Sequence, residues 1–228
     1  IAATQFNQTT DTPIRFRTYQ GISGNYDANL DQYEQLVTDI EANSVSGLLF
    51  SSAPFELVGT AIYNNDLPKV AIRTPGTEDQ YPSVNVCGSA LIQTAFELLS
   101  DLNCRRVAVV GGNVDQRIIT RQFQEQAERL GMDSSPYLLQ SIRLSQTEWA
   151  DNLMPLLFRG EDHPDGLLIL DDSLLTSVLH GLSLAGFSAG GALPVVCQTN
   201  FPYPTTKQAD VIRIGFDVRQ MLKLSLEL

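Results

Sequence analysis

The sequence predicts an α/β protein in which mainly parallel β-sheet is covered by helices on both faces. Short apolar segments alternate with amphipathic segments along the whole chain, which is typical of consecutive βαβ units. Residues 106–131 show this unit most clearly, because a β-branched run over 107–110 ends in Gly111 and Gly112 and leads through a polar loop into a helix. The apolar positions expected on that helix are Ile119, Phe123, Ala127 and Leu130.

The segments before this unit predict four strands and three helices. The expected strands are 14–20, 47–50, 69–72 and 84–86, and the expected helices are 27–43, 55–63 and 91–102. The helix 27–43 is predicted from a stripe of apolar residues at helical spacing. The helix 55–63 is expected to bury four apolar side chains. These positions are Leu30, Tyr33, Val37 and Ile40 in the first helix, and Leu57, Val58, Ala61 and Ile62 in the second.

The segments after the unit continue the alternation. Strands are expected at 137–144, 167–170, 193–197 and 211–214, and helices at 149–158, 174–185 and from Asp217 onward. Residues 1–6 have the pattern of a helix tail, and residues 221–228 that of an unfinished helix. We therefore expect that residues are missing from one or both ends of this sequence.

Composition and charge limit the possible functions. The chain has 228 residues with a net charge of −11, and its densest basic spot is Arg105 next to Arg106. A surface that binds nucleic acid needs clustered basic side chains to neutralise phosphates, so this chain is not expected to bind DNA by itself. No apolar run approaches the roughly 20 residues that cross a bilayer.

The cysteines and histidines predict neither disulfides nor a metal site. The chain has three cysteines, and two of them, Cys104 and Cys197, border apolar strands and are expected to be buried thiols. This usage favours a reducing compartment, and we expect a cytoplasmic protein. The two histidines, His163 and His180, lack zinc-ligand spacing to any cysteine.

No motif predicts catalysis. The chain lacks a P-loop, a G-x-G-x-x-G fingerprint and a G-x-S-x-G nucleophile motif, and its two histidines suggest no triad. Asp171 and Asp172 suggest a magnesium site at first sight, but adjacent residues of a strand point to opposite faces. We therefore expect no enzyme activity, no cofactor and no metal.

The order of several segments resembles the effector-binding core of LacI/GalR-type transcriptional regulators, whose fold is that of the type I periplasmic sugar-binding proteins. The segments that carry this resemblance are "VSGLLF" at 45–50, "LPKVAI" at 67–72, "LLSDLNCRRVAVVGG" at 98–112, "RQFQEQAERLGM" at 121–132, "HPDGLLILDDSLLTSVLHGLSLAGF" at 163–187 and "LPVVCQTN" at 193–200. Each motif is weak alone, but their order and spacing along nearly the whole chain are fairly specific.

The resemblance implies two doubly wound, parallel-sheet lobes around a cleft that closes on a small molecule. We expect residues 1–104 and 208–228 to form the N-terminal lobe and residues 105–207 the C-terminal lobe. Three positions depart from the family pattern. Cys87 replaces an acidic residue, Thr199 and Asn200 replace an aspartate pair, and the family's arginine falls near Ile119, with Arg117 two positions earlier. The family's sugar contacts are therefore altered, and the ligand is expected to be an uncommon sugar, a sugar acid or a nucleoside.

The candidate ligand residues follow or end predicted strands, where α/β sheets bind ligands. They are Ser52 and Arg73 in the first lobe, Asp115, Arg117, Asp172, Thr199 and Asn200 in the second, and Phe216 at the hinge. Those of the second lobe and the hinge also have a plainer interpretation. Asp115 caps a helix, Arg117 is solvated, Thr199 and Asn200 form loop hydrogen bonds, and Phe216 packs in the core. One of Asp171 and Asp172 is expected to cap the following helix, and Asp172 is favoured as the ligand residue.

The predicted function is effector sensing in a transcriptional regulator. A DNA-binding module is expected before Ile1, and a homodimer would place two such modules on a two-fold operator. The alternative is a periplasmic or lipoprotein solute-binding protein of a transporter, which would be a secreted monomer. An upstream DNA-binding module in the full gene would support the regulator, and a signal peptide would support the solute-binding protein.

Overall fold

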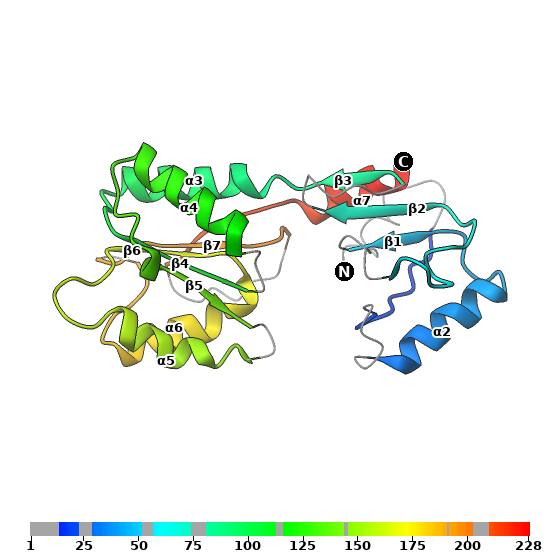
Figure 1. Cartoon of the computed structure of the whole chain (residues 1–228), viewed down its shortest axis with the longest axis horizontal. Coiled ribbons are helices and arrows are strands. Elements are labelled where there is room, and N and C mark those ends of the chain that lie inside the picture. Colours follow the sequence, from blue (N-terminus) through cyan, green and yellow to red (C-terminus); the bar gives the residue numbers. More distant parts are fainter. Residues whose placement is uncertain are drawn as a thin grey trace. The chain divides into compact units, whose positions relative to one another are not determined.

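Two parallel β-sheets organise the part of the chain that the structure describes (Figure 1). The computed structural model describes residues 14–22, 29–51, 57–73, 81–112, 116–143, 146–190, 192–202 and 210–228. The chain divides into two units, each with its own sheet. The first unit comprises Ile1–Cys87 and Asp217–Leu228, and the second comprises Gly88–Phe216.

The first unit contains a three-stranded parallel sheet in the order β1-β2-β3. Its strands are β1 (Leu48–Phe50), β2 (Lys69–Arg73) and β3 (Ser83–Asn85), and its helices are α2 (Leu30–Glu41) and α7 (Val218–Glu227). Helix α7 packs against β2 and β3, although it comes from the far end of the chain. Helix α2 contributes Leu36 to a small core with Leu57 and Ile62.

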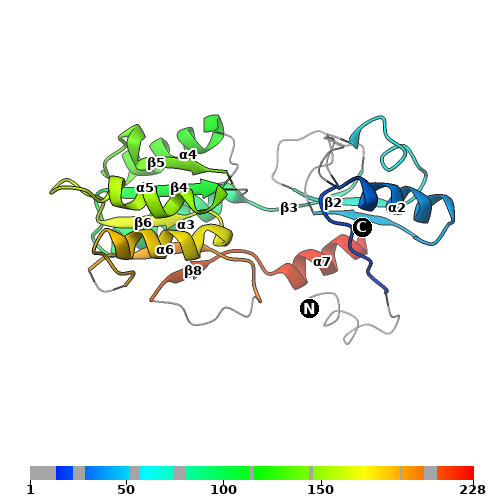
Figure 2. The same ribbon diagram turned by 90° about the horizontal axis from the view of Figure 1, so that it is seen from below.

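The second unit contains a five-stranded parallel sheet in the order β5-β4-β6-β7-β8. The strands are β4 (Val107–Gly112), β5 (Leu139–Ile142), β6 (Gly166–Ile169), β7 (Val195–Gln198) and β8 (Ile212–Ile214). Helices α3 (Gly88–Asp101) and α4 (Gln116–Arg129) cover one face, and α5 (Trp149–Leu157) and α6 (Leu175–Leu184) cover the other (Figures 1 and 2). This is the arrangement predicted from the alternation of apolar and amphipathic segments.

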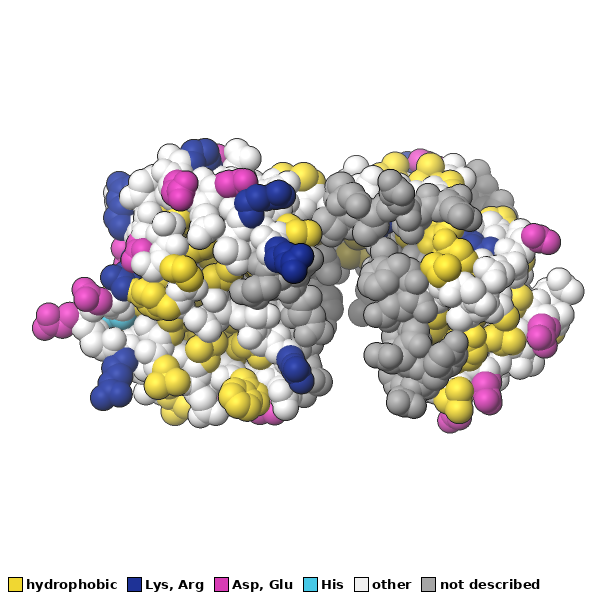
Figure 3. Space-filling model, in the orientation of Figure 1, with side chains coloured by type: hydrophobic (Ala, Val, Ile, Leu, Met, Phe, Trp, Pro, Cys, Tyr) yellow, Lys and Arg dark blue, Asp and Glu magenta, His cyan; other side chains and the backbone are white. Residues whose placement is uncertain are grey.

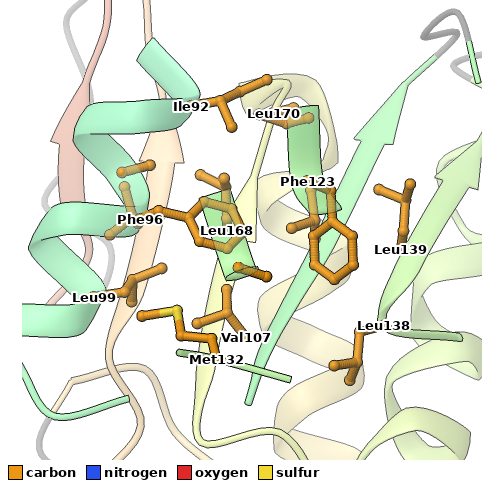
Figure 4. Packing of buried hydrophobic residues seen from close by; sticks show 14 of the residues in the cluster. Ile92, Phe96, Leu99, Val107, Phe123, Met132, Leu138, Leu139, Leu168 and Leu170 are labelled. Atoms are coloured by element: carbon orange, nitrogen blue, oxygen red, sulfur yellow. The ribbon is translucent and has the colours of Figure 1, made fainter. Parts of the chain in front are cut away.

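The central strand β4 is buried on both faces, and its side chains alternate between two cores. Val107 and Val109 pack with α3 and α4, whereas Ala108 and Val110 pack with α5 and α6. On the α3/α4 side, Phe96 and Phe123 meet edge to face with ring centroids 5.9 Å apart (Figure 4). The continuous apolar run of β4 is therefore explained by burial on both faces.

Asp165 holds the start of β4 against the start of β6. Its carboxylate accepts hydrogen bonds from the backbone N–H of Arg105, at 3.0 and 2.8 Å, and from that of Arg106, at 2.8 Å. The next residue, Gly166, leaves room for the buried Cys104, whose Sγ would lie 2.8 Å from a Cβ at that position. These contacts fix the register of β4 and β6 at the edge of the sheet where the strands begin.

Two predicted elements of the first unit are wrong. Residues 14–20 are not a strand, because alternating side chains alone do not provide a hydrogen-bonded neighbouring strand. Side chains hold this segment instead, since the Tyr19 hydroxyl donates to Asp39 Oδ2 at 2.5 Å and Tyr19 packs against the small core.

The helix predicted at 55–63 is a series of turns over its described part, residues 57–63. Gly59 has a φ of +87°, which interrupts a right-handed helix, and the Thr60 hydroxyl donates to the Leu57 carbonyl at 2.6 Å. Leu57 and Ile62 are buried as expected, but Val58 is 61% exposed because the turns do not keep a helical stripe.

The division into units differs from the expected lobe boundaries at both crossings. The structure divides the chain after Cys87 and after Phe216, where the sequence suggested residues 104 and 208. Helix α3 belongs to the second unit because Phe96 and Leu99 are fully buried in its core. Strand β8 belongs there because it pairs with β7.

Candidate functional site

The carboxyl ends of all five strands of the second sheet meet at one edge. All four strand pairings are parallel, so the residues that follow each strand gather at this edge. Asp171 and Asp172 come shortly after β6, Thr199 and Asn200 directly after β7, and Phe216 shortly after β8. We call the ends of β6, β7 and β8, with the residues just after them, the β6–β8 edge.

The two aspartates after β6 have different tasks. The Asp171 carboxylate accepts from the backbone N–H of Ser173 at 2.9 Å and from its hydroxyl at 2.5 Å, and so caps the short 3-10 helix Asp172–Leu174 that leads into α6. Asp172 is partly buried and makes no such cap. Burial raises the pKa of Asp172, the neighbouring Asp171 raises it further, and Arg213 acts in the opposite direction.

Thr199 is buried and joins β7 to β8. Its backbone N–H donates to the Ile214 carbonyl at 2.7 Å, and its hydroxyl accepts from Arg213 Nη1 at 3.4 Å. Its exposed fraction is 1%. The backbone of Gly215 passes so close that a Cβ there would lie 1.7 Å from the Thr199 carbonyl oxygen. This position therefore requires glycine. Asn200, the next residue, is exposed.

Arg213 lies on the same face of the sheet as Cys197. The two residues are register partners on β8 and β7, and Ile212 and Ile214 on either side of Arg213 pack toward the α3/α4 core. The sequence analysis missed this residue. The pattern Ile-Arg-Ile in a short strand could have indicated it, because alternation places the arginine on the face opposite the two isoleucines.

The thiol of Cys197 lies among the polar groups of the β6–β8 edge. Burial raises its pKa to about 12, the charge of Asp172 adds to this shift, and Thr199 and Arg213 act in the opposite direction. All three neighbours therefore lie within electrostatic range of one buried sulfur. A thiol with so high a pKa stays protonated at neutral pH and is a poor nucleophile.

The structure describes three further residues predicted from the sequence, Arg73, Arg117 and Phe216. Arg73 ends β2 in the first unit and is half-buried. Arg117 is exposed in the first turn of α4. Phe216 is half-buried and packs against the α3/α4 core, as in its plainer interpretation. Ser52 and Asp115 lie outside the described residues.

Neither histidine lies at the β6–β8 edge. The His163 ring packs against those of Phe158 and Phe187, with centroids 6.1 and 4.8 Å away, and His180 Nδ1 lies 3.2 Å from Asp151 Oδ2. Across the described residues, no group of three or more His, Cys, Asp or Glu side chains could hold a metal ion. Over the same residues, no helix is both long and apolar enough to cross a membrane.

The sequence identifies the family of this fold. Residues 96–223, more than half of the chain, match the model of the periplasmic binding protein-like domain. The chain belongs to this family. The matched segment contains the whole β6–β8 edge. No curated protein matches the chain in sequence.

Solved structures share the fold of this periplasmic binding protein-like domain. A protein from Bacillus cereus subsp. cytotoxis, assigned as a LacI transcriptional regulator, has a TM-score of 0.74 at 15% identity, over 99% of this chain and 79% of its own. A LacI family regulator from Lactobacillus casei with bound glucose has a TM-score of 0.68 at 13% identity, over 99% of this chain and 83% of its own. A LacI family regulator from Clostridium acetobutylicum has a TM-score of 0.63 at 16% identity, over 81% and 71%.

Proposed function

We propose that this chain is the effector-sensing domain of a LacI-type transcriptional regulator. It binds a small polar molecule, a sugar or a related compound, and controls DNA binding by an attached module. The observation that carries this proposal is the β6–β8 edge, which groups a carboxylate, a hydroxyl and a guanidinium at the ligand-binding edge of a periplasmic binding protein-like sheet. The proposal is supported by similarly folded proteins that are named as LacI family regulators.

The proposed contacts keep the residues expected from the sequence. Carboxylate oxygens accept hydrogen bonds from ligand hydroxyls, and amide groups both accept and donate them. An aromatic ring stacks on the apolar face of a sugar or purine. In the second unit these residues are Asp115, Arg117, Asp172, Thr199, Asn200 and Phe216, and in the first unit they are Ser52 and Arg73. Because Thr199 is buried, its hydroxyl acts by orienting Arg213.

The proposed domain senses and does not catalyse. The proposed role needs neither metal nor cofactor, and the buried, protonated thiol of Cys197 is not suited to nucleophilic attack. An effector controls a regulator only if it binds one conformation more tightly than another. We place the protein in the cytoplasm as a homodimer, whose two-fold symmetry matches that of an operator.

A thermal-shift screen of sugars, sugar acids and nucleosides tests the proposal. A ligand at about 100 times its Kd stabilises the folded state by about 2.7 kcal/mol, which gives a clear rise in Tm. We expect Arg117→Ala to remove most of that rise. Arg121→Ala is the control, because Arg121 is exposed one turn further along α4 and pairs with Glu125 at 3.7 Å.

Two results would contradict parts of the proposal. An equal rise in Tm for the parent and for Arg117→Ala would make Arg117 a surface residue without a ligand contact. A signal peptide in place of a DNA-binding module in the full gene would favour a solute-binding protein of a transporter.

A further inference from the structure

Arg213 has an unusual position for an arginine in this sheet. It occupies the middle of β8, with Ile212 and Ile214 packed toward the α3/α4 core, so its side chain starts from the opposite face beside Cys197. It is half-buried there, which limits its mobility more than at an exposed site. The strand therefore fixes the backbone position from which the Arg213 side chain extends.

The hydrogen-bonding capacity of Arg213 is largely unused within the described residues. Its one hydrogen bond runs from Nη1 to Thr199 Oγ1 at 3.4 Å, which is long for an N–H···O bond. Among those residues it forms no ion pair. A guanidinium carries several N–H donors in a planar fork, so most of them remain for solvent or a ligand.

The nearby carboxylate does not neutralise this cation. Asp172 and Arg213 influence each other electrostatically, but they form no ion pair in the structure. The capping aspartate, Asp171, has its own partner in Ser173. The β6–β8 edge therefore presents a guanidinium and a carboxylate that influence each other electrostatically without forming an ion pair.

We propose that Arg213 binds an acidic group of the effector while Asp172 accepts hydrogen bonds from its hydroxyls, so that the effector is a polyhydroxylated acid. The inference rests on the proposed effector binding and narrows it from sugars in general to sugar acids and sugar phosphates. The planar fork of arginine matches a carboxylate or a phosphate, whereas a carboxylate side chain suits hydroxyl donors. A neutral sugar would offer the Arg213 guanidinium hydroxyl acceptors but no opposite charge.

The competing explanation is that Arg213 protects an edge strand. Strand β8 lies at the end of the sheet order, and charged side chains on edge strands prevent pairing with other chains. In that case, replacing Arg213 would promote aggregation and leave ligand binding unchanged. The two roles therefore differ in a measurable way.

The experiment compares matched acids and neutral sugars on the 228-residue chain. The probes are D-gluconate, D-glucuronate, D-galacturonate and glucose 6-phosphate against D-glucose and D-galactose, at equal ionic strength, by thermal shift and titration calorimetry. The variants are Arg213→Gln and Arg213→Lys. Arg159→Gln is the control, since Arg159 is an exposed arginine of the same unit. Gel filtration of each variant reports aggregation.

We expect at least one acid to bind tenfold or more tightly than its neutral counterpart. Arg213→Gln should weaken that acid at least tenfold, Arg213→Lys should weaken it less because it keeps the charge without the fork, and Arg159→Gln should change nothing. Comparison of the three carboxylates with glucose 6-phosphate shows which kind of acidic group is bound.

Three results would overturn the inference. Tighter binding of a neutral sugar, with Arg213→Gln unchanged, would refute the acidic effector and leave the proposed function intact. If none of the acids binds, the inference is refuted as well. If, in addition, no neutral sugar and no nucleoside binds, the proposed function is refuted. If Arg213→Gln does not fold, the comparison of acids with neutral sugars on the parent chain still tests whether the effector is an acid.

Discussion

At the scale of single residues, the β6–β8 edge is built from neighbours with distinct tasks. Asp171 caps a helix turn, Thr199 is buried in the link between two strands, and Gly215 allows the backbone to pass close to it. These structural residues hold Asp172 and Arg213 within electrostatic range of each other. We therefore expect the positions of Asp172 and Arg213 to depend on these neighbours.

Replacing Gly215 tests this dependence. We expect Gly215→Ala to lower the free energy of unfolding by about 1–3 kcal/mol, because the new Cβ would lie 1.7 Å from the Thr199 carbonyl oxygen and the backbone must move. Urea unfolding measures the change. Gly88→Ala is the control, because no atom lies within 4 Å of its Cβ position. Equal stability of Gly215→Ala and the parent would show that the two strands can separate without cost.

At the scale of elements, the first unit depends on a side-chain contact between α2 and the segment 14–20. Asp39 of α2 accepts from Tyr19 at 2.5 Å and from Gln35 at 3.1 Å, and lies 2.6 Å from Arg17. The hydrogen bond from Tyr19 lowers the pKa of Asp39, and Arg17 and Gln35 act in the same direction. The ionised carboxylate therefore stabilises the folded state.

The pH dependence of stability follows from this sign. Because the pKa of Asp39 is lowered on folding, its carboxylate stabilises the folded state fully at pH values above the ordinary pKa of 3.8. This contribution disappears as the pH falls through the folded pKa. We expect Asp39→Asn to be less stable than the parent at neutral pH and to approach it as the pH falls through the lowered folded pKa of Asp39. Urea unfolding followed by circular dichroism over a pH series measures this. Glu34→Gln, at an exposed position of α2, should follow the parent throughout.

Helices α5 and α6 approach each other closely at Gly181. A Cβ at this position would lie 2.6 Å from the Ala150 carbonyl oxygen and 3.0 Å from Met154 Cβ. Alanine improves helix propensity by about 1 kcal/mol, but contact with backbone is hard to relieve. We expect Gly181→Ala to cost about 1–3 kcal/mol net, measured by urea unfolding. The exposed Ser183→Ala on the same helix is the control, and a more stable Gly181→Ala would contradict the close packing.

At the scale of the whole molecule, the regulator proposal predicts association of the chain with itself. We expect sedimentation at tens of micromolar, roughly the working range for a weak interface of small buried area, to show a concentration-dependent dimer. A two-fold dimer is what an operator with two half-sites requires. A strict monomer over that range would count against the regulator and favour a solute-binding protein.

The charge of the chain predicts that it does not bind DNA by itself. Its net charge is −11, and on the face in Figure 3 the basic side chains are dispersed rather than gathered in a stripe. Fluorescence anisotropy with random duplex should show no salt-sensitive binding, because few phosphate counterions can be released. Tight binding at moderate salt that weakens steeply as salt rises would contradict this prediction.

The sequence by itself determined the class of the fold and most of its elements. Periodicity is local, so the β-branched run of β4 and the apolar stripe of α4 predicted their elements without knowledge of their neighbours. The same reasoning predicted that Cys104 and Cys197 are buried and that one aspartate of the pair after β6 caps a helix.

Only the tertiary structure decided which residues meet. The alternating segment 14–20 is not a strand, because a strand exists only beside a partner that the local pattern cannot supply. Arg213 lies beside Cys197 and Thr199 because β8 pairs with β7, although the sequence between these two strands gives no indication of their register. A ligand site at a sheet edge is made by strand order, and strand order is set by burial and hydrogen bonding over the whole unit.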